Sequence, residues 1–151
     1  MRYILDTNII IYASQSKRFV AELNRDYSIF NSSEPLIIST VTLGELDSFT
    51  KQRNYGDKRR KLIQQLTDDI TVVPINIKDV IKMYGTIDAF SQGKLINRPA
   101  SFTACNMGKN DLWIAAIAAT FNLNLVTTDR DFTHLHNEFF QVTYVDIEQY
   151  R

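Results

Sequence analysis

The chain has 151 residues, of which 44% are hydrophobic, and its 17 basic and 17 acidic residues leave a formal net charge of zero. A chain of this size is expected to form one domain, residues 1–151, around a substantial core. The balanced charge excludes a global attraction to nucleic acid, so a local basic patch or a metal ion has to hold any polyanion. The single Cys105 excludes an internal disulfide and a cysteine-rich zinc site, and it agrees with a cytoplasmic location. No apolar run is long enough for a membrane span or a signal peptide.

Short apolar runs alternate with helical periodicities along the whole chain. Strands are predicted at 2–5, 36–39, 71–73, 123–127 and 141–145. Helices are predicted at 8–13, 17–31, 41–54, 57–67, 77–91 and 110–121, and a short one begins near 130. Residues 93–108 contain two glycines and a proline and are predicted to form a loop. The alternation implies parallel pairing in a three-layer α/β domain.

Four acidic residues lie where predicted strands end or helices begin, namely Asp6, Glu45, Asp111 and Asp129. Each has an ordinary structural explanation. Asp6 and Asp129 can cap the helices that follow them, and Asp111 suits the positive end of a helix dipole. Thr42 to Glu45 has the form of a capping box, in which the glutamate accepts from a backbone N–H. Capping alone does not explain why all four acids would lie at the carboxyl edge of one parallel sheet. That edge is where α/β proteins bind ligands, so a shared binding site explains the joint placement better.

The helix predicted at 110–121 is rich in alanine and can therefore approach the sheet closely. Ala115 lies one turn after Asp111 on the same side. Close packing there would hold the Asp111 carboxylate over the carboxyl edge of the sheet. A plain buried alanine-rich helix is the simpler interpretation, and the two are compatible.

Four blocks of the sequence resemble, in the same order, the motifs of PIN-domain nucleases. They are Ile4–Tyr12, Ser39–Leu46, Asn110–Ala116 and Leu125–Phe132, and they span most of the chain. Length and motif style resemble the VapC-type toxins of prokaryotic toxin–antitoxin pairs. The resemblance implies a PIN-like α/β/α sandwich with a mainly parallel sheet of about five strands. It also implies RNA cleavage that depends on Mg²⁺ or Mn²⁺, and inhibition by a small antitoxin.

The same resemblance assigns residues to the site. The catalytic and metal-binding positions of the family fall on Asp6, Glu45, Asp111 and Asp129. Polar positions that contact the substrate or support the acids fall on Thr7, Asn8, Asn110 and Thr127, with Asp131 as a second acid whose role varies. The chain departs from the family in the long stretch from Gln92 to Lys109, and this leaves substrate access and antitoxin contact open in that region.

The chemistry expected of such a site is hydrolysis of a phosphodiester bond. Carboxylates are hard oxygen ligands that suit Mg²⁺ or Mn²⁺, and the ion lowers the pKa of bound water, neutralises the phosphate and orients in-line attack. We expect Asp6, Asp111 and Asp129 to ligate directly. We expect Glu45 to ligate or to orient the water. Without metal the crowded carboxylates repel, so at least one of them should have a raised pKa.

Six basic residues fall within the eleven positions 51–61. One interpretation is an RNA contact, in which Arg53, Lys58 and Arg59 bind phosphates and Tyr55 stacks on a base. Solvated helix ends or an antitoxin contact are alternatives that the sequence does not separate.

Aromatic residues on the early helices, Phe19, Tyr27 and Phe30, are expected mostly in the core, although some could serve an antitoxin or homodimer interface. A homodimer is the default oligomer.

Other classes of function have less support. His134 and His136 are two positions apart and face different sides of a helix, so a zinc site is not expected. No glycine-rich phosphate-binding loop is present. A phosphatase of the haloacid dehalogenase type would carry an aspartate where Asn8 stands. The remaining alternative is a non-catalytic PIN-like module that binds RNA or protein, and the intact acid set argues against it.

Overall fold

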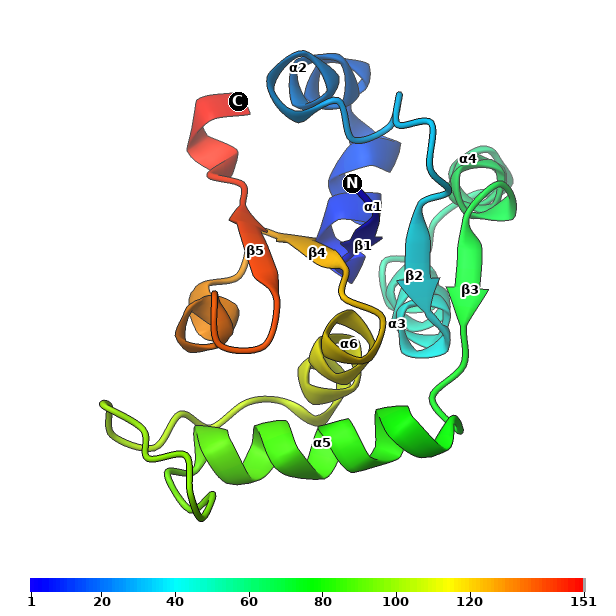
Figure 1. Ribbon diagram of the computed structural model, residues 1–151. Helices are drawn as coiled ribbons and strands as arrows, with labels where there is room; N and C mark the ends of the chain where they lie inside the picture. The colour runs from blue at the N-terminus through cyan, green and yellow to red at the C-terminus, as the bar shows by residue number, and fades with distance from the viewer. Residues whose placement is uncertain (151) are drawn as a thin grey trace.

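A five-stranded parallel sheet forms the centre of the computed structural model, which describes residues 1–150 (Figure 1). The strands are β1 (Tyr3–Leu5), β2 (Ile37–Ser39), β3 (Thr71–Val73), β4 (Asn124–Thr127) and β5 (Gln141–Tyr144), in the order β3-β2-β1-β4-β5. Every neighbouring pair is parallel. The chain moves outward from β1 to β3 and then returns to place β4 on the other side of β1. The switch point therefore lies between β1 and β4, and ligands of open α/β sheets bind at such points.

Helices cover both faces of this sheet (Figure 1). They are α1 (Thr7–Gln15), α2 (Lys17–Tyr27), α3 (Thr40–Gln52), α4 (Asp57–Asp68), α5 (Lys78–Ser91) and α6 (Lys109–Thr120), with the 3-10 helices η1 (Arg130–Leu135) and η2 (Ile147–Tyr150). The predicted three-layer α/β/α architecture is confirmed. Within residues 1–150, no helix combines the length and apolarity that crossing a membrane requires.

Neighbouring residues of each central strand pack into different layers. Ile4 and Ile37 belong to the core beneath α5 and α6. Leu5 and Ile38 belong to the core shared with α1, α2, α3 and α4. Because both faces are buried, these strands are continuous apolar runs rather than alternating ones. That pattern made the strands predictable from the sequence.

The predicted elements are found with small shifts at their ends, except that the helix predicted at 17–31 is too long. Helix α2 ends at Tyr27, because Ser28 takes a left-handed conformation with φ of 54° and its N–H bonds to the carbonyl of Asn24. The Asn24 side chain then accepts from the backbone N–H of Phe30 at 2.7 Å. These local bonds end the helix well before Pro35.

The three early aromatic residues divide between core and surface. Phe19 is buried, with ring contacts to Tyr12 and to Tyr150 of η2. Phe30 is half-buried, and Tyr27 is exposed. The expectation that they lie mostly in the core holds for Phe19, so only Tyr27 of the three offers an exposed ring.

Residues 92–108 form an irregular segment that is fixed to its neighbours. The backbone N–H of Cys105 donates to the carbonyl of Ser91 at 2.7 Å, at the end of α5. The ring of Phe102 meets Phe90 edge-on, with 5.4 Å between centroids. The segment is therefore an ordered part of the layer that contains α5.

Helix α6 packs closely because its buried positions are small. Ala115 has no exposed surface and sits in the core under α5 and α6. Ala115→Leu is expected to lower the free energy of unfolding by about 1–3 kcal/mol, because the added methylenes must displace packed neighbours. Urea denaturation measures this, with the exposed Ala21→Leu on α2 as the matched control. Equal stability of the two variants would contradict close packing of α6.

Candidate active site

Asp6 follows β1 directly and is buried, with 5% of its surface exposed. Its Oδ1 accepts from the backbone N–H of Thr7 at 2.7 Å, so it does cap α1. Its Oδ2 accepts from the hydroxyl of Thr127 at 2.7 Å. The same hydroxyl oxygen accepts from the backbone N–H of Asp129 at 3.0 Å. These hydrogen bonds therefore fix the Asp6 carboxylate at the switch point and tie it to the end of β4.

Glu45 lies inside α3 and is oriented by α1. The hydroxyl of Thr7 donates to Glu45 Oε1 at 2.8 Å and lies 3.3 Å from the buried hydroxyl of Thr42. The capping-box interpretation of Thr42 to Glu45 is wrong, because Ser39 is the N-cap of α3. With the cap formed by Ser39, Glu45 falls in the second turn and is directed to the Thr7 hydroxyl. Thr7 therefore contacts both Asp6 and Glu45.

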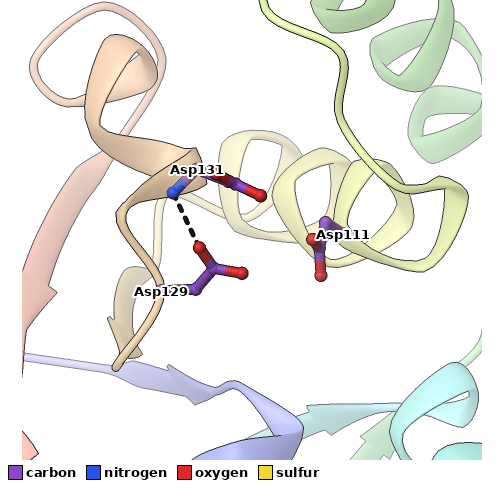
Figure 2. A group of neighbouring side chains, drawn as sticks. All are labelled: Asp111, Asp129 and Asp131. Carbon is purple, nitrogen blue, oxygen red and sulfur yellow. Dashed lines mark hydrogen bonds between the residues drawn. The ribbon is translucent and has the colours of Figure 1, made fainter.

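Three further carboxylates converge from two other segments (Figure 2). Asp111 lies in the first turn of α6, and Asp129 and Asp131 follow β4. One carboxylate oxygen from each lies within 4.8 Å of the others. Asp129 is the N-cap of η1, and its Oδ1 accepts from the backbone N–H of Asp131 at 2.8 Å. This turn brings Asp131 into the group of three close carboxylates with Asp111 and Asp129. The sequence analysis did not place it there.

The five acids act on one another electrostatically. Burial is the main cause that raises the pKa of Asp111 to about 7, and the charges of Asp6, Asp129, Glu45 and Asp131 raise it further. Burial also raises the pKa of Asp6 to about 6, against the opposing effect of its two hydrogen bonds. We call these five residues the acid cluster. Its crowding is the condition that sequence analysis expected of the metal-free site.

The chemistry of the acid cluster fits a hard divalent cation. All of its donor atoms are carboxylate oxygens, which Mg²⁺ and Mn²⁺ prefer. Asp111, Asp129 and Asp131 already lie close enough to share one ion. A cation would also relieve the repulsion that helps to raise the pKa of Asp111.

A groove of about 600 Å³ extends from the acid cluster between α1 and α3. Thr7, Asn8, Glu45 and Asn110 line its end at the cluster, and Phe49 and Gln52 lie among its other lining residues. Asn8 and Asn110 thus lie beside the acids, where the family resemblance places polar residues.

The basic residues at 51–61 lie at the end of α3 and the start of α4. The guanidinium of Arg59 lies 4.4 Å from the centre of the Tyr55 ring, and that of Arg53 lies 5.4 Å from the Phe49 ring. Lys58, Arg53 and Arg59 are exposed. Because Arg59 lies over Tyr55, this ring is less open to stacking by a base than the sequence suggested.

Known proteins with similar sequences are ribonucleases by name. The chain is 30% identical over 132 residues to "Ribonuclease VapC2" of Haemophilus influenzae, covering 85% of this chain and 87% of that protein. It is 33% identical over 146 residues to "Ribonuclease VapC1" of the same species, covering 95% of this chain and 93% of that protein.

Solved structures share the fold at lower identity. VapBC2 from Rickettsia felis, bound to a promoter DNA fragment, aligns with a TM-score of 0.71 at 22% identity, covering 97% of this chain and all of that one. VapBC-1 from nontypeable Haemophilus influenzae aligns with a TM-score of 0.68 at 24% identity, covering 95% of this chain and 98% of that one. The PIN domain family model matches residues 3–137, a range that holds all five acids. On this match and on the identity with the two curated relatives, the chain belongs to the PIN-domain family.

Proposed function

We propose that this protein is a metal-dependent endoribonuclease and the toxin of a toxin–antitoxin pair. The acid cluster carries the proposal, because it gathers five carboxylates at the switch point of a parallel sheet and brings three within 4.8 Å of one another. The names of the curated relatives, ribonucleases of the VapC type, support the reaction. The titles of the structural neighbours, which are toxin–antitoxin complexes, support the partner.

In this proposal Asp6, Glu45, Asp111 and Asp129 hold Mg²⁺ or Mn²⁺, and Asp131 adds a fifth carboxylate beside them. When bound, such an ion supplies Lewis-acid stabilisation of the phosphate and a lowered pKa for a water molecule. This chain's residues keep the donors in place. The Asp6 carboxylate is held through both oxygens, by Thr7 and Thr127, so it cannot turn away from the cluster.

Glu45 is the residue best placed to orient the attacking water. Its Oε1 accepts from Thr7, which leaves Oε2 to accept a hydrogen bond from water. Asn8 and Asn110 line the adjoining groove, and their amides can donate to phosphate oxygens. These residues would position the scissile phosphate without taking part in bond breaking.

The groove between α1 and α3 supplies a path for RNA away from the acid cluster. It reaches Phe49 and Gln52, and Arg53 and Arg59 lie at the same end of α3. In a chain of zero net charge, these cations would supply the local attraction to phosphates. The proposed partners are thus an RNA substrate and a small antitoxin, with a homodimer as the assembly and the cytoplasm as the location.

Asp6→Asn tests the proposed reaction directly. Purified wild type is expected to cleave structured RNA with Mn²⁺ and to lose this activity with a chelator. Asp6→Asn is expected to be slower by on the order of a hundredfold or more, because it removes one charged donor while asparagine can still cap α1. The exposed Asp69→Asn is the matched control and should cleave like wild type.

Two outcomes would contradict the proposed reaction in different ways. Equal cleavage by wild type and Asp6→Asn would place the activity outside the acid cluster. Tight RNA binding by wild type with no cleavage under any divalent metal would point to a non-catalytic binding module instead. Growth arrest on induction of wild type, absent with Asp6→Asn, would extend the result to the toxin role.

The metal-free chain is expected to lose stability as the pH rises. The pKa of Asp6 is about 6 and that of Asp111 about 7 in the folded chain, above the ordinary 3.8. The folded state therefore holds these protons more tightly than the unfolded state. This contribution to stability is full below about pH 4 and is lost as the pH passes through the folded values.

Asp111→Asn, which is always neutral, isolates this effect. In a chelator it is expected to be more stable than wild type at pH 8 and to lose that advantage at pH 5, as measured by chemical denaturation. Mn²⁺ should stabilise wild type at pH 8 more than it stabilises the variant. A stability difference that does not change between pH 5 and pH 8 would contradict the raised pKa of Asp111.

Arg59→Gln tests the basic residues as an RNA contact. It is expected to raise KM several-fold with kcat unchanged, and to reduce the slope of log affinity against log salt by about one. Lys82→Gln removes an exposed charge from α5, in the opposite layer, and is the matched control. If Arg59→Gln and Lys82→Gln had the same KM and salt dependence, Arg59 would be a solvated helix residue.

A further inference from the structure

A second hollow, of about 440 Å³, adjoins the acid cluster and is separate from the groove between α1 and α3. Its walls are the segment 105–107 and the start of η1, and Asp131 belongs both to its lining and to the acid cluster. We propose that this hollow binds one unpaired nucleotide of the substrate RNA next to the cleaved bond. In this arrangement Asn106 donates to the base and Arg130 lies near its phosphate. The inference rests on the proposed ribonuclease function and assigns a subsite to it.

The two walls of the hollow are held at a fixed separation by one buried side chain. Ser91, at the end of α5, has no exposed surface. Its hydroxyl lies 2.8 Å from His134 Nε2, on the η1 wall, and 3.5 Å from the sulfur of Met107, on the other wall. Its carbonyl accepts from the N–H of Cys105 at 2.7 Å. The hollow is therefore formed before any ligand arrives, which reduces the entropic cost of binding.

A second anchor holds the far part of the same segment. The guanidinium of Arg98 lies 4.1 Å from the centre of the Phe139 ring and 5.5 Å from that of Phe90. It also contacts Glu138 through both the backbone carbonyl and the carboxylate. The segment is thus tied to α5 and to the residues that follow η1, and the wall at 105–107 does not depend on the bonds of Ser91 alone.

Asn106 can serve as a hydrogen-bond donor to a ligand in the hollow. Its Oδ1 accepts from the side-chain amide of Gln92 at 3.1 Å. This bond commits the carbonyl oxygen and leaves the Nδ2 hydrogens to donate. Bases carry ring nitrogens and carbonyl oxygens that accept such bonds, and these edges are open when the base is unpaired. The hydroxyl of Thr133, on the opposite wall, can donate or accept.

Arg130 supplies the positive charge that a strand crossing five carboxylates needs. Its guanidinium lies 3.9 Å from the centre of the Tyr144 ring. Within residues 1–150 it takes part in none of the salt bridges, so its charge is not neutralised by a paired carboxylate. It is exposed and lines the hollow beside Asp131. A phosphate flanking the cleaved bond would be attracted to this point.

The chemistry of the hollow favours a nucleotide over a segment of a protein partner. Five of its seven lining residues have polar or charged side chains, which can bind a base edge and a phosphate, and none of the seven belongs to a strand. The surface that these residues expose in the hollow is largely apolar, which suits the flat face of a base. Its volume falls within the roughly 300–1,000 Å³ of small-ligand sites. Its continuity with the acids through Asp131 fits a substrate that spans both places.

The cleavage pattern on a library of single-stranded RNAs with random sequence tests the inference. Wild type with Mn²⁺ is expected to show a nucleotide preference at one position flanking the cleaved bond. Asn106→Ala is expected to reduce that preference roughly tenfold, leaving the preferences at other positions unchanged. Ser101→Ala, exposed in the same segment and outside the lining, is the matched control. An unchanged pattern in Asn106→Ala would overturn the inference.

Cys105 offers an independent measurement, because it lines the hollow and is the chain's single cysteine. In the Asp6→Asn chain, single-stranded RNA at about ten times its Kd is expected to slow alkylation by N-ethylmaleimide roughly tenfold. Duplex RNA should slow it much less. Bound single-stranded RNA that leaves the alkylation rate unchanged would overturn the inference.

The two proposals fail in distinguishable ways. Absence of metal-dependent cleavage by wild type would overturn the ribonuclease proposal, and the subsite with it. Cleavage by wild type with an unaltered pattern in Asn106→Ala would overturn the subsite alone.

Discussion

Repulsion among carboxylates at one edge of the sheet is the constraint on which the rest of the site depends. Burial and neighbouring acids raise the pKa of Asp6 and Asp111. Ionising these two carboxylates in the metal-free chain therefore costs free energy. The fold offsets part of that cost with donors. Backbone N–H groups at the starts of α1 and η1 and the hydroxyls of Thr7 and Thr127 donate to Asp6, Glu45 and Asp129. These bonds hold the acids together without neutralising them, which is the state that a cation can bind.

The topology explains why distant parts of the sequence supply these acids. Asp6 and Asp129 follow β1 and β4, the two strands on either side of the switch point. Helix α3 leaves β2 at the same edge and carries Glu45. Helix α6 leads into β4 and runs back across the sheet, so its first turn, with Asp111, also lies at the carboxyl edge. The acid cluster is thus a consequence of parallel pairing with a reversal after β3.

The sequence predicted the fold and much of the site's arrangement because the relevant signals are local and repeated. Buried strands and amphipathic helices have distinct periodicities, and acids at their junctions must meet at one edge once the strands are parallel. Two predictions, the N-cap of α3 and the end of α2, were wrong because other residues formed the caps. The serine before α3 formed the cap that Thr42 was expected to form, and Asn24 with Ser28 ended α2 early. Such choices depend on tertiary position, which periodicity does not encode.

Other features of the site could not be derived from the sequence for a different reason. Asp131 enters the tight group of acids only because Asp129 caps a 3-10 turn that begins at the next residue. The family resemblance marked Asp131 as a second acid of varying role, but its place beside the other carboxylates depends on how this 3-10 turn is oriented. The composition of the long segment before α6 did not indicate that it packs against the rest of the domain. Its contacts with Ser91 show that it does.

The arginines around the site share one arrangement, in which an aromatic ring orients the guanidinium. This arrangement bears on how a chain of zero net charge could bind a polyanion. Arg53, Arg59 and Arg130 each lie over an aromatic ring, and within residues 1–150 none of them is paired with a carboxylate in a salt bridge. A salt bridge would orient a guanidinium but cancel its charge. A ring orients it while leaving the charge and the N–H donors available. Arg53 lies at the end of α3, Arg59 at the start of α4 and Arg130 beside Asp131, so positive charge stands near both hollows that adjoin the acids. If RNA binds as proposed, a strand held at these points would carry its phosphates across the acid cluster despite the repulsion there, and the rings beneath the arginines would be part of the substrate-binding surface as much as the cations.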